Sequence, residues 1–202
     1  MTRPTPTQMW KRLLRAWHKG PACQLEMARQ YTSAFPARAH GWIVLADGLA
    51  GVARYSEAQD ALRRASRLIE PDRRWFIAVQ WGHLYREKHD QKSAERWYRK
   101  AVAARPSTST HIFLGATLAK QGRFAEAKRH HRQAIKLAKH AQSDAPDEAH
   151  YNLGLILRAE RRYKEAAGHL MKALALDPKY KIAKEALQDV QKAVRFREAG
   201  EQ

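Results

Sequence analysis

Ten histidines and one cysteine are the residues of this chain whose types suit metal binding or nucleophilic chemistry. A metal site on a helix usually takes two histidines three or four residues apart, and no two histidines here have that spacing. The neighbours His130 and His131 would point about 100° apart on a helix, and we expect His131 to fill a packing position. Cys23 has no adjacent histidine or acid to activate its thiol. We therefore predict no metal, no cofactor and no catalytic residue, and we expect that the protein is not an enzyme.

A pattern of small and large apolar residues recurs four times along the chain. Each copy has one alanine followed seven residues later by another, and a leucine or tryptophan thirteen residues before the first alanine. The leading alanines are Ala58, Ala94, Ala127 and Ala166, with spacings of 36, 33 and 39 residues. A period in this range is typical of stacked helical repeats rather than of a single globular core.

Within each copy, the apolar residues have helical spacing on both sides of a short break. Leu45 and Leu49, for example, are four residues apart and therefore lie on one face of a helix. A small residue follows each leading leucine or tryptophan, and this lets two helix backbones approach closely. These small residues are Ala46, Gly82, Gly115 and Gly154. We predict two packed helices in each copy, with Gly154 facing Ala166.

The four copies resemble the tetratricopeptide repeat (TPR) family. The resemblance is clearest in the fourth copy, which reads AHYNLGLILRAERRYKEAAGHLMKALALDP from Ala149 to Pro178. The second copy departs from the pattern at Gln91, where an aromatic residue is usual, and the first has Ala46 in place of glycine. The resemblance implies an all-α fold, in which antiparallel helix pairs stack into a right-handed superhelical solenoid. The first helices of the pairs would line a concave groove.

The domain organisation follows from this pattern and from the segments on either side of it. We predict four repeats, at 39–74, 75–107, 108–146 and 147–178. Residues 1–38 are predicted to form an N-terminal capping helix pair, a degenerate repeat, with an apolar stripe of Trp10, Leu13, Leu14 and Trp17. Residues 179–202 are predicted to form a C-terminal capping helix with a frayed tail, since a stack leaves its last apolar face open. Extra residues near 140–147 predict a longer second helix in the third repeat.

The groove is where the family usually binds, so the inward positions of the first helices are candidate binding residues. The predicted groove residues are Ile43, Val44, Phe76, Val79, His83, Arg86, Ile112, Phe113, Lys120, Tyr151, Asn152, Leu155 and Arg158, and Asp47, Gln80 and Ala116 also project inward. Such a surface suits an extended or helical segment with apolar anchors and a few acids. The alternative for Ile43, Val79 and Ile112 is that they pack against the neighbouring repeat.

The net charge of +18 is the second feature with a bearing on function. The excess lies at the N-terminus and in the middle repeats, with +6 in residues 1–38, +4 in residues 75–107 and +5 in residues 108–146. Much of it falls on predicted second helices, at Arg96, Arg99, Lys100, Lys128, Arg129, Arg132 and Lys136. These charges suit a solvated surface that keeps the protein soluble. The alternative is a docking surface for an acidic partner, a nucleic acid or an anionic membrane.

We therefore predict a non-catalytic scaffold or adaptor that binds a peptide or protein segment in the groove. The alternative function is binding of nucleic acid or an acidic membrane surface through the basic face, and self-association is a further alternative. No apolar run approaches the roughly 20 residues of a membrane span. A single cysteine suits a reducing compartment, so we expect a cytoplasmic location. The basic, acid-poor N-terminus leaves an organellar presequence as the alternative.

Overall fold

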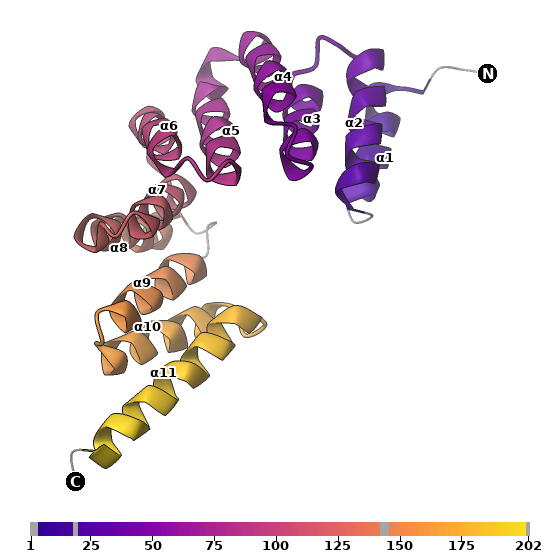
Figure 1. Ribbon diagram of the computed structural model, residues 1–202. Coiled ribbons are helices and arrows are strands. Elements are labelled where there is room, and N and C mark those ends of the chain that lie inside the picture. Colours follow the sequence, from indigo (N-terminus) through magenta and orange to yellow (C-terminus); the bar gives the residue numbers. More distant parts are fainter. Residues whose placement is uncertain (1–3, 18–19, 142–145, 201–202) are drawn as a thin grey trace. The chain divides into compact units, whose positions relative to one another are not determined.

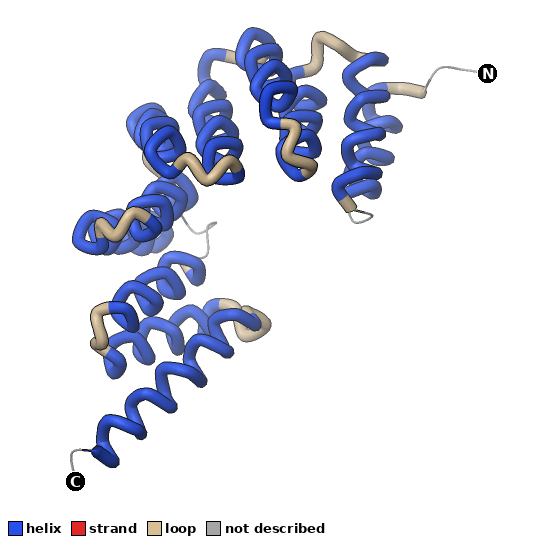
Figure 2. The backbone as a smooth tube through the Cα atoms, viewed as in Figure 1, coloured by secondary structure: helices blue, strands red, loops and turns tan. Residues whose placement is uncertain are grey.

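The computed structural model describes residues 4–17, 20–141 and 146–200. Over these residues the chain is helical, with short loops between the helices and no strand (Figures 1 and 2). The predicted all-α architecture of packed helix pairs is therefore confirmed. The chain divides into two compact units, Met1–Ala104 and Arg105–Gln202, which we call the N-terminal and the C-terminal unit.

The N-terminal unit contains three helix pairs. Its helices are α1 (Pro6–Trp17), α2 (Pro21–Ala34), α3 (Ala39–Gly51), α4 (Tyr55–Leu68), α5 (Arg74–Glu87) and α6 (Gln91–Ala104), with a short 3₁₀ turn at Pro71–Arg73. Helices α3 and α4 pack closely together, as do α5 and α6, while α2 packs on α3 and α4 on α5. Helices that follow one another in the sequence therefore also pack against one another.

The first helix of this unit packs through the predicted apolar stripe, with one exception. Leu13 is fully buried, and Trp10 packs edge-on against Tyr31 of α2 with ring centroids 5.5 Å apart. Leu14 is 45% exposed, so the buried face of α1 continues instead through Met9, one turn before Leu13. The side chain of Trp17 lies outside the described side chains.

The C-terminal unit contains two helix pairs and a final single helix. Its helices are α7 (Thr108–Lys120), α8 (Phe124–Ala141), α9 (Asp147–Ala159), α10 (Tyr163–Leu176) and α11 (Lys181–Gly200). Helix α8 has 18 residues where α10 has 14, which confirms the predicted longer helix. Helix α11 packs on α10 and buries Ala183, Ala186 and Val190.

The pairs α5/α6, α7/α8 and α9/α10 are each held close by a glycine on the first helix that lies under a large side chain of the second. A Cβ atom placed on Gly154 would lie 2.7 Å from Cγ of Leu170 and 3.3 Å from the carbonyl oxygen of Ala166. The predicted contact with Ala166 therefore exists through its backbone, and Leu170 is the nearer neighbour. In the same way, Gly115 lies under the ring of His131, and Gly82 under that of Tyr98.

His131 fills this packing position in the third repeat, as predicted, although it is a polar residue. Its side chain is fully buried, and neither ring nitrogen makes a hydrogen bond within the described chain. Burial, with a smaller contribution from His130, lowers its pKa to about 4. The equivalent position is occupied by Leu62 in the first repeat and by Leu170 in the fourth.

We expect Gly154→Ala to lower the free energy of unfolding by about 1–3 kcal/mol, because the new methyl group overlaps Leu170 in a closely packed pair. Gly168→Ala in α10 is the matched control, since a Cβ atom there has no neighbour within 4 Å. This control should be neutral or should stabilise by up to about 1 kcal/mol through helix propensity. Chemical denaturation of both variants measures the difference. Equal stability of the two would contradict the close approach of α9 and α10.

We expect His131→Leu to stabilise the protein by about 1–2 kcal/mol at pH 7, because it removes two buried ring nitrogens without partners. The gain should grow as the pH falls towards 5. The unfolded histidine then takes up a proton below its ordinary pKa of 6.5, while the folded one resists protonation down to about pH 4. Thermal unfolding at the two pH values tests this. A gain that does not depend on pH would show that the ring is not held neutral in the folded protein.

Candidate functional site

A polar recess in the N-terminal unit is the candidate functional site. It has a volume of about 290 Å³ and is bordered by α2, α3 and α5, with part of its wall from α4. Ala46, Ala50, Leu62 and Leu84 line its apolar part. The polar lining consists of Gln24, Asp47, Gln80, His83, Arg86 and Glu87.

The packing of α2 and α3 brings the polar residues of the recess together. Gly48 lies next to Asp47, and a Cβ atom there would be only 3.3 Å from Cα of Leu25. The two backbones therefore approach closely, and this places Gln24 beside the end of α3. On α5, Gln80 and His83 are three residues apart and so share one face of the helix.

Three polar side chains of the recess have no partner within the described chain. Gln24 and Gln80 are buried, with 8% and 7% of their surface exposed, and Asp47 is half-buried. None of these three side chains makes a hydrogen bond or an ion pair among the described residues. The polar atoms of these three side chains reach the solvent inside the recess, so a polar ligand bound there would replace water as their hydrogen-bond partner.

The electrostatics of the recess are set by burial and by two charged neighbours on α5. Burial, together with the negative charge of Glu87, raises the pKa of Asp47 from 3.8 to about 6. Burial, together with the positive charge of Arg86, lowers the pKa of His83 to about 4, so His83 is neutral at pH 7. Arg86 lies 3.4 Å from the carboxylate of Glu87, as an ion pair. Near pH 7 the recess therefore holds two carboxylates, one guanidinium and a neutral imidazole.

The structure divides the predicted groove residues of the N-terminal unit into two groups. His83 and Arg86 meet at the recess, together with the inward-projecting Asp47 and Gln80. Phe76 is half-buried and packs against the core of this unit. Three aliphatic residues are 4–6% exposed and belong to the packing between helices rather than to an open surface: Ile43, Val44 and Val79. For Ile43 and Val79 this agrees with the alternative that they pack against the neighbouring repeat, and Val44 corrects the groove prediction.

Sequence reasoning missed Gln24 and Glu87 as residues of the recess. The signal for Gln24 was present, because it lies four residues before Ala28 and seven before Tyr31, both of which are buried. A glutamine on the apolar stripe of a helix is an exception to the pattern. Glu87 had no comparable signal, since a charged residue at the end of a helix is ordinary.

In the C-terminal unit, several predicted groove residues have partners from the last helix or its approach. The ring of Tyr151 packs against that of Tyr180, with centroids 5.2 Å apart, and Arg158 lies 3.8 Å from Asp189 of α11. Leu155 packs against the core that α10 and α11 share. Because α11 lies against this end of the unit, these side chains are less available than the sequence suggested.

The remaining predicted groove residues of this unit differ in exposure. Ile112 is 4% exposed and is a core residue, which agrees with the alternative that it packs between helices instead of lining the groove. Phe113 and Asn152 are half-buried, and Lys120 is exposed at the end of α7.

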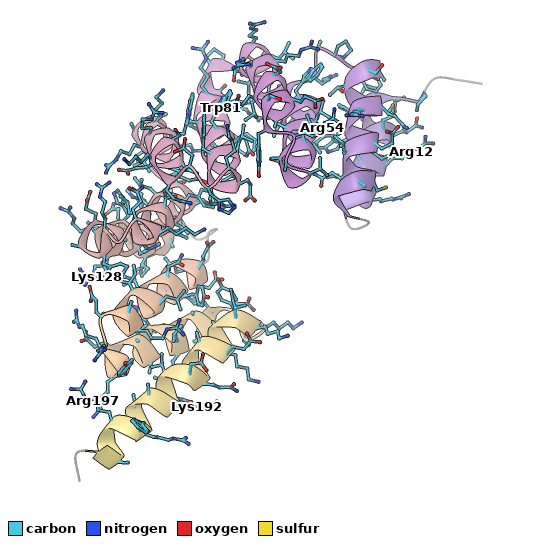
Figure 3. All side chains as sticks on the ribbon, viewed as in Figure 1. Arg12, Arg54, Trp81, Lys128, Lys192 and Arg197 are labelled. Atoms are coloured by element: carbon cyan, nitrogen blue, oxygen red, sulfur yellow. The ribbon has the colours of Figure 1, made fainter. Side chains whose placement is uncertain are left out.

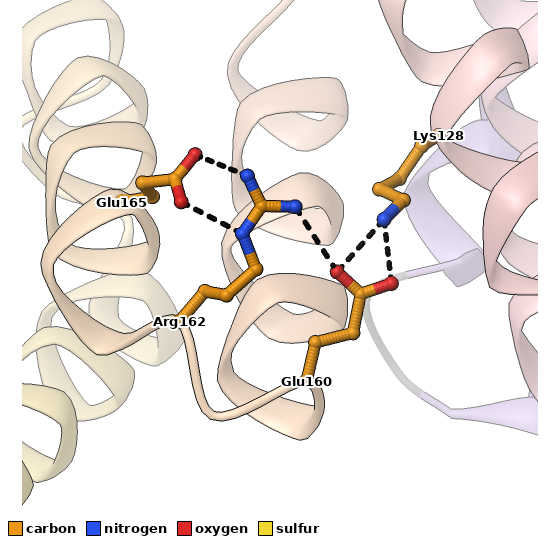
Figure 4. Close-up of polar contacts among 4 residues, drawn as sticks. All are labelled: Lys128, Glu160, Arg162 and Glu165. Atoms are coloured by element: carbon orange, nitrogen blue, oxygen red, sulfur yellow. Dashed lines mark hydrogen bonds and ion pairs between the residues drawn. The ribbon is translucent and has the colours of Figure 1, made fainter.

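The predicted basic surface includes residues with partners of their own. Lys128 is the clearest correction, because its ammonium lies 2.5 and 2.7 Å from the two carboxylate oxygens of Glu160 and only 14% of the side chain is exposed. Arg162 extends this cluster, pairing with both Glu160 and Glu165 (Figure 4). Lys128 therefore joins α8 to the end of α9 and is not a free surface charge.

The other predicted basic residues lie on two helices in different units. On α6, Arg99 pairs with Glu95 at 2.8 Å, Arg96 donates to the hydroxyl of Ser93, and Lys100 lies 4.1 Å from the ring centroid of Trp97. The exposed basic residues predicted on α8 are Arg129, Arg132 and Lys136, and Lys139 of the same helix is exposed as well. Arg12 of α1 and Lys192 of α11 also project from their helices (Figure 3).

Four of the histidines form two pairs, each between the two helices of one repeat. The Nδ1 atoms of His111 and His130 are 2.9 Å apart, and those of His150 and His169 are 3.0 Å apart. Burial lowers the pKa of His111, His150 and His169, that of His150 to about 4. Among the described residues, no group of three or more His, Cys, Asp or Glu side chains is arranged to hold a metal ion.

None of the described helices combines the length and the apolar character needed to cross a lipid bilayer.

Comparison with known proteins agrees with the fold and the repeat pattern. Two models of the tetratricopeptide repeat family match the sequence, one over residues 106–179 and the other over residues 79–108. Together they span residues 79–179, half of the chain. The chain belongs to the tetratricopeptide repeat family. No curated protein matches it in sequence.

Solved structures resemble the chain over most of its length. TTC0263, a thermophilic TPR protein of Thermus thermophilus, has a TM-score of 0.69 and 16% identity, covering 93% of this chain and 99% of its own. BtubC from P. vanneervenii has a TM-score of 0.70 and 17% identity, with 92% and 84% covered. YrrB, described as a TPR protein with an unusual peptide-binding site, has a TM-score of 0.58 and 20% identity, with 88% of each chain covered. At these identities the likeness is one of fold.

We expect Asp47→Asn to raise the free energy of unfolding by about 1–2 kcal/mol at pH 7.5. The pKa of Asp47 lies near 6 in the folded protein and near 3.8 in the unfolded chain, so its contribution to stability falls as the pH rises from about 4 to 6. The asparagine should therefore stabilise most above pH 6, and its effect should be clearly smaller at pH 4.5, where the folded carboxyl is still protonated.

Urea denaturation of the parent and the variant at both pH values measures this difference. Asp72→Asn is the control, because Asp72 is exposed and lies outside the recess. A variant that is less stable than the parent at pH 7.5 would show that Asp47 has a stabilising partner.

Proposed function

We propose that this protein is a non-catalytic interaction scaffold that binds a segment of a partner polypeptide at the recess of its N-terminal unit. The family supports the general class, because tetratricopeptide repeat proteins are generally non-catalytic scaffolds for protein–protein interaction. The observation that carries the proposal is the recess itself, with Gln24, Asp47 and Gln80 unpaired among the described residues around a space partly lined by apolar side chains.

A polypeptide segment suits the recess better than a drug-sized molecule does. Small-molecule sites usually have volumes of about 300–1,000 Å³ and bury most of their ligand. The recess, at about 290 Å³, is large enough for one side chain with its backbone attachment left outside. A segment lying along α3 and α5 would place one residue in the recess and its neighbours on the exposed edges of these helices.

The alternative function, anion binding through the basic face, rests on exposed cations of α8. The exposed cations of α8 in the described chain are Arg129, Arg132, Lys136 and Lys139, and they lie in the C-terminal unit. Exposed cations are common on soluble proteins, and these four point to no particular ligand. The recess itself suits a phosphate backbone poorly, because Asp47 and Glu87 bring two carboxylates to it.

A random-peptide display selection on the purified protein tests the proposal. Parent protein should enrich a consensus peptide. Ala50→Phe, which places a ring in the recess, should weaken binding of that peptide by at least about tenfold, because the anchoring side chain no longer fits. Ala103→Phe is the matched control, since Ala103 is exposed on α6 away from the recess.

Circular dichroism and thermal unfolding of both variants confirm that they fold before affinities are compared by fluorescence polarisation. If no consensus is enriched, or if both phenylalanine variants bind like the parent, the recess is not a peptide-binding site.

A further inference from the structure

The unpaired groups of the recess share one chemical property: each offers oxygen atoms that accept hydrogen bonds. Asp47 has two carboxylate oxygens, and Gln24 and Gln80 each have an amide oxygen, all without partners in the described chain. The carboxylate of Glu87 also lines the recess. The two glutamine amides can also donate through their NH2 groups, but the carboxylates of Asp47 and Glu87 only accept. These carboxylates therefore favour a ligand group that brings several hydrogen-bond donors.

The charges select among ligands that carry donors. Asp47 has no cation paired with it in the described chain, and the guanidinium that lines the recess, that of Arg86, lies against Glu87 at 3.4 Å. His83 does not add a positive charge at pH 7, since its pKa is lowered to about 4. The recess thus has an excess of one negative charge, although the chain as a whole carries +18. The Asp47 carboxylate would repel an anionic group, and a neutral donor would leave the negative charge of Asp47 without a counter-charge.

From these contacts we infer that the recess binds the guanidinium group of an arginine residue in the partner segment. The planar guanidinium has five N–H donors, which can bridge the two carboxylate oxygens of Asp47 and still reach the amide oxygens of Gln24 and Gln80. The apolar wall of Ala46, Ala50, Leu62 and Leu84 is the surface on which the hydrocarbon stem of an arginine packs.

This inference rests on the proposed function, and it predicts a partner segment with a positive charge at the recess instead of an acid. The sequence had predicted a partner with acids that pair with basic residues of the groove. In the recess, one of those basic residues, Arg86, is already paired within the chain. The group that lacks a partner there among the described residues is a carboxylate, so the complementary charge on the ligand is positive.

The raised pKa of Asp47 is consistent with this assignment. A buried carboxylate next to another carboxylate is costly when ionised, and an approaching cation lowers that cost. Binding of a guanidinium should therefore lower the pKa of Asp47 and be accompanied by proton release at pH values near 6.

Three capped tripeptides test the inference: acetyl-Gly-Arg-Gly-amide, the same peptide with citrulline, and the same peptide with lysine. Citrulline has the shape of arginine without its charge. Nuclear magnetic resonance titration of the full-length protein should show shifts at Asp47 and Gln80 with the arginine peptide. The citrulline peptide should bind at least about tenfold more weakly, and the lysine peptide should fall between them because an ammonium cannot bridge both oxygens in one plane.

Asp47→Asn supplies the second arm, since it keeps the shape of the side chain and removes its charge. Affinity for the arginine peptide should fall at least about tenfold in this variant, while Asp72→Asn, the control outside the recess, should bind like the parent. Equal binding of the arginine and citrulline peptides, no effect of Asp47→Asn, or no shift at about 10 mM peptide would each overturn the inference.

The display selection separates this inference from the proposed function. A consensus that depends on an open recess but contains no arginine would leave the peptide-binding function intact and overturn the guanidinium assignment. A consensus with a shared arginine that also loses binding in Asp47→Asn would support both.

Discussion

The close approach of paired helices is the constraint on which the rest of this structure depends. In three repeats, a glycine of the first helix leaves room for a large side chain of the second: Gly82 for Tyr98, Gly115 for His131 and Gly154 for Leu170. These three side chains differ in polarity but not in position, and each is fully buried. The pattern shows that the contact is set by space, because any large side chain that fills the gap above the glycine is accepted.

Glycines also allow close packing between the successive helices α2 and α3, and this packing shapes the recess. A Cβ atom on Gly41 would overlap the ring of Tyr31, and Gly48 lies against the backbone of α2 at Leu25. Helix α2 is therefore held close to α3. Without these two small residues, Gln24 would stand away from Asp47, and the recess would open into a surface.

Several acidic side chains of this basic chain pair with a nearby cation, whereas Asp47 in the recess does not pair with any described cation. The arginine that precedes a second helix pairs with a glutamate three residues later in the first, third and fourth repeats, as in Arg162 with Glu165. Such exposed pairs contribute little stability individually. Asp47 lies in a less exposed place and has no such partner in the described chain, and this costs stability in the free protein. Groups that are costly to the fold but suited to a ligand are expected at binding sites.

The sequence by itself determined the repeat and its packing residues, including the buried position of His131, because these depend on local spacing along a helix. The tertiary structure decided which inward-facing residues are accessible and which have partners. Ile43 and Asp47 lie one turn apart on the same face, yet packing buries Ile43 in the core and leaves Asp47 at the edge of a recess. The ion pair of Lys128 with Glu160 joins residues 32 positions apart. No local periodicity encodes such a distance, so the sequence predicted a free basic residue where the fold forms an ion pair.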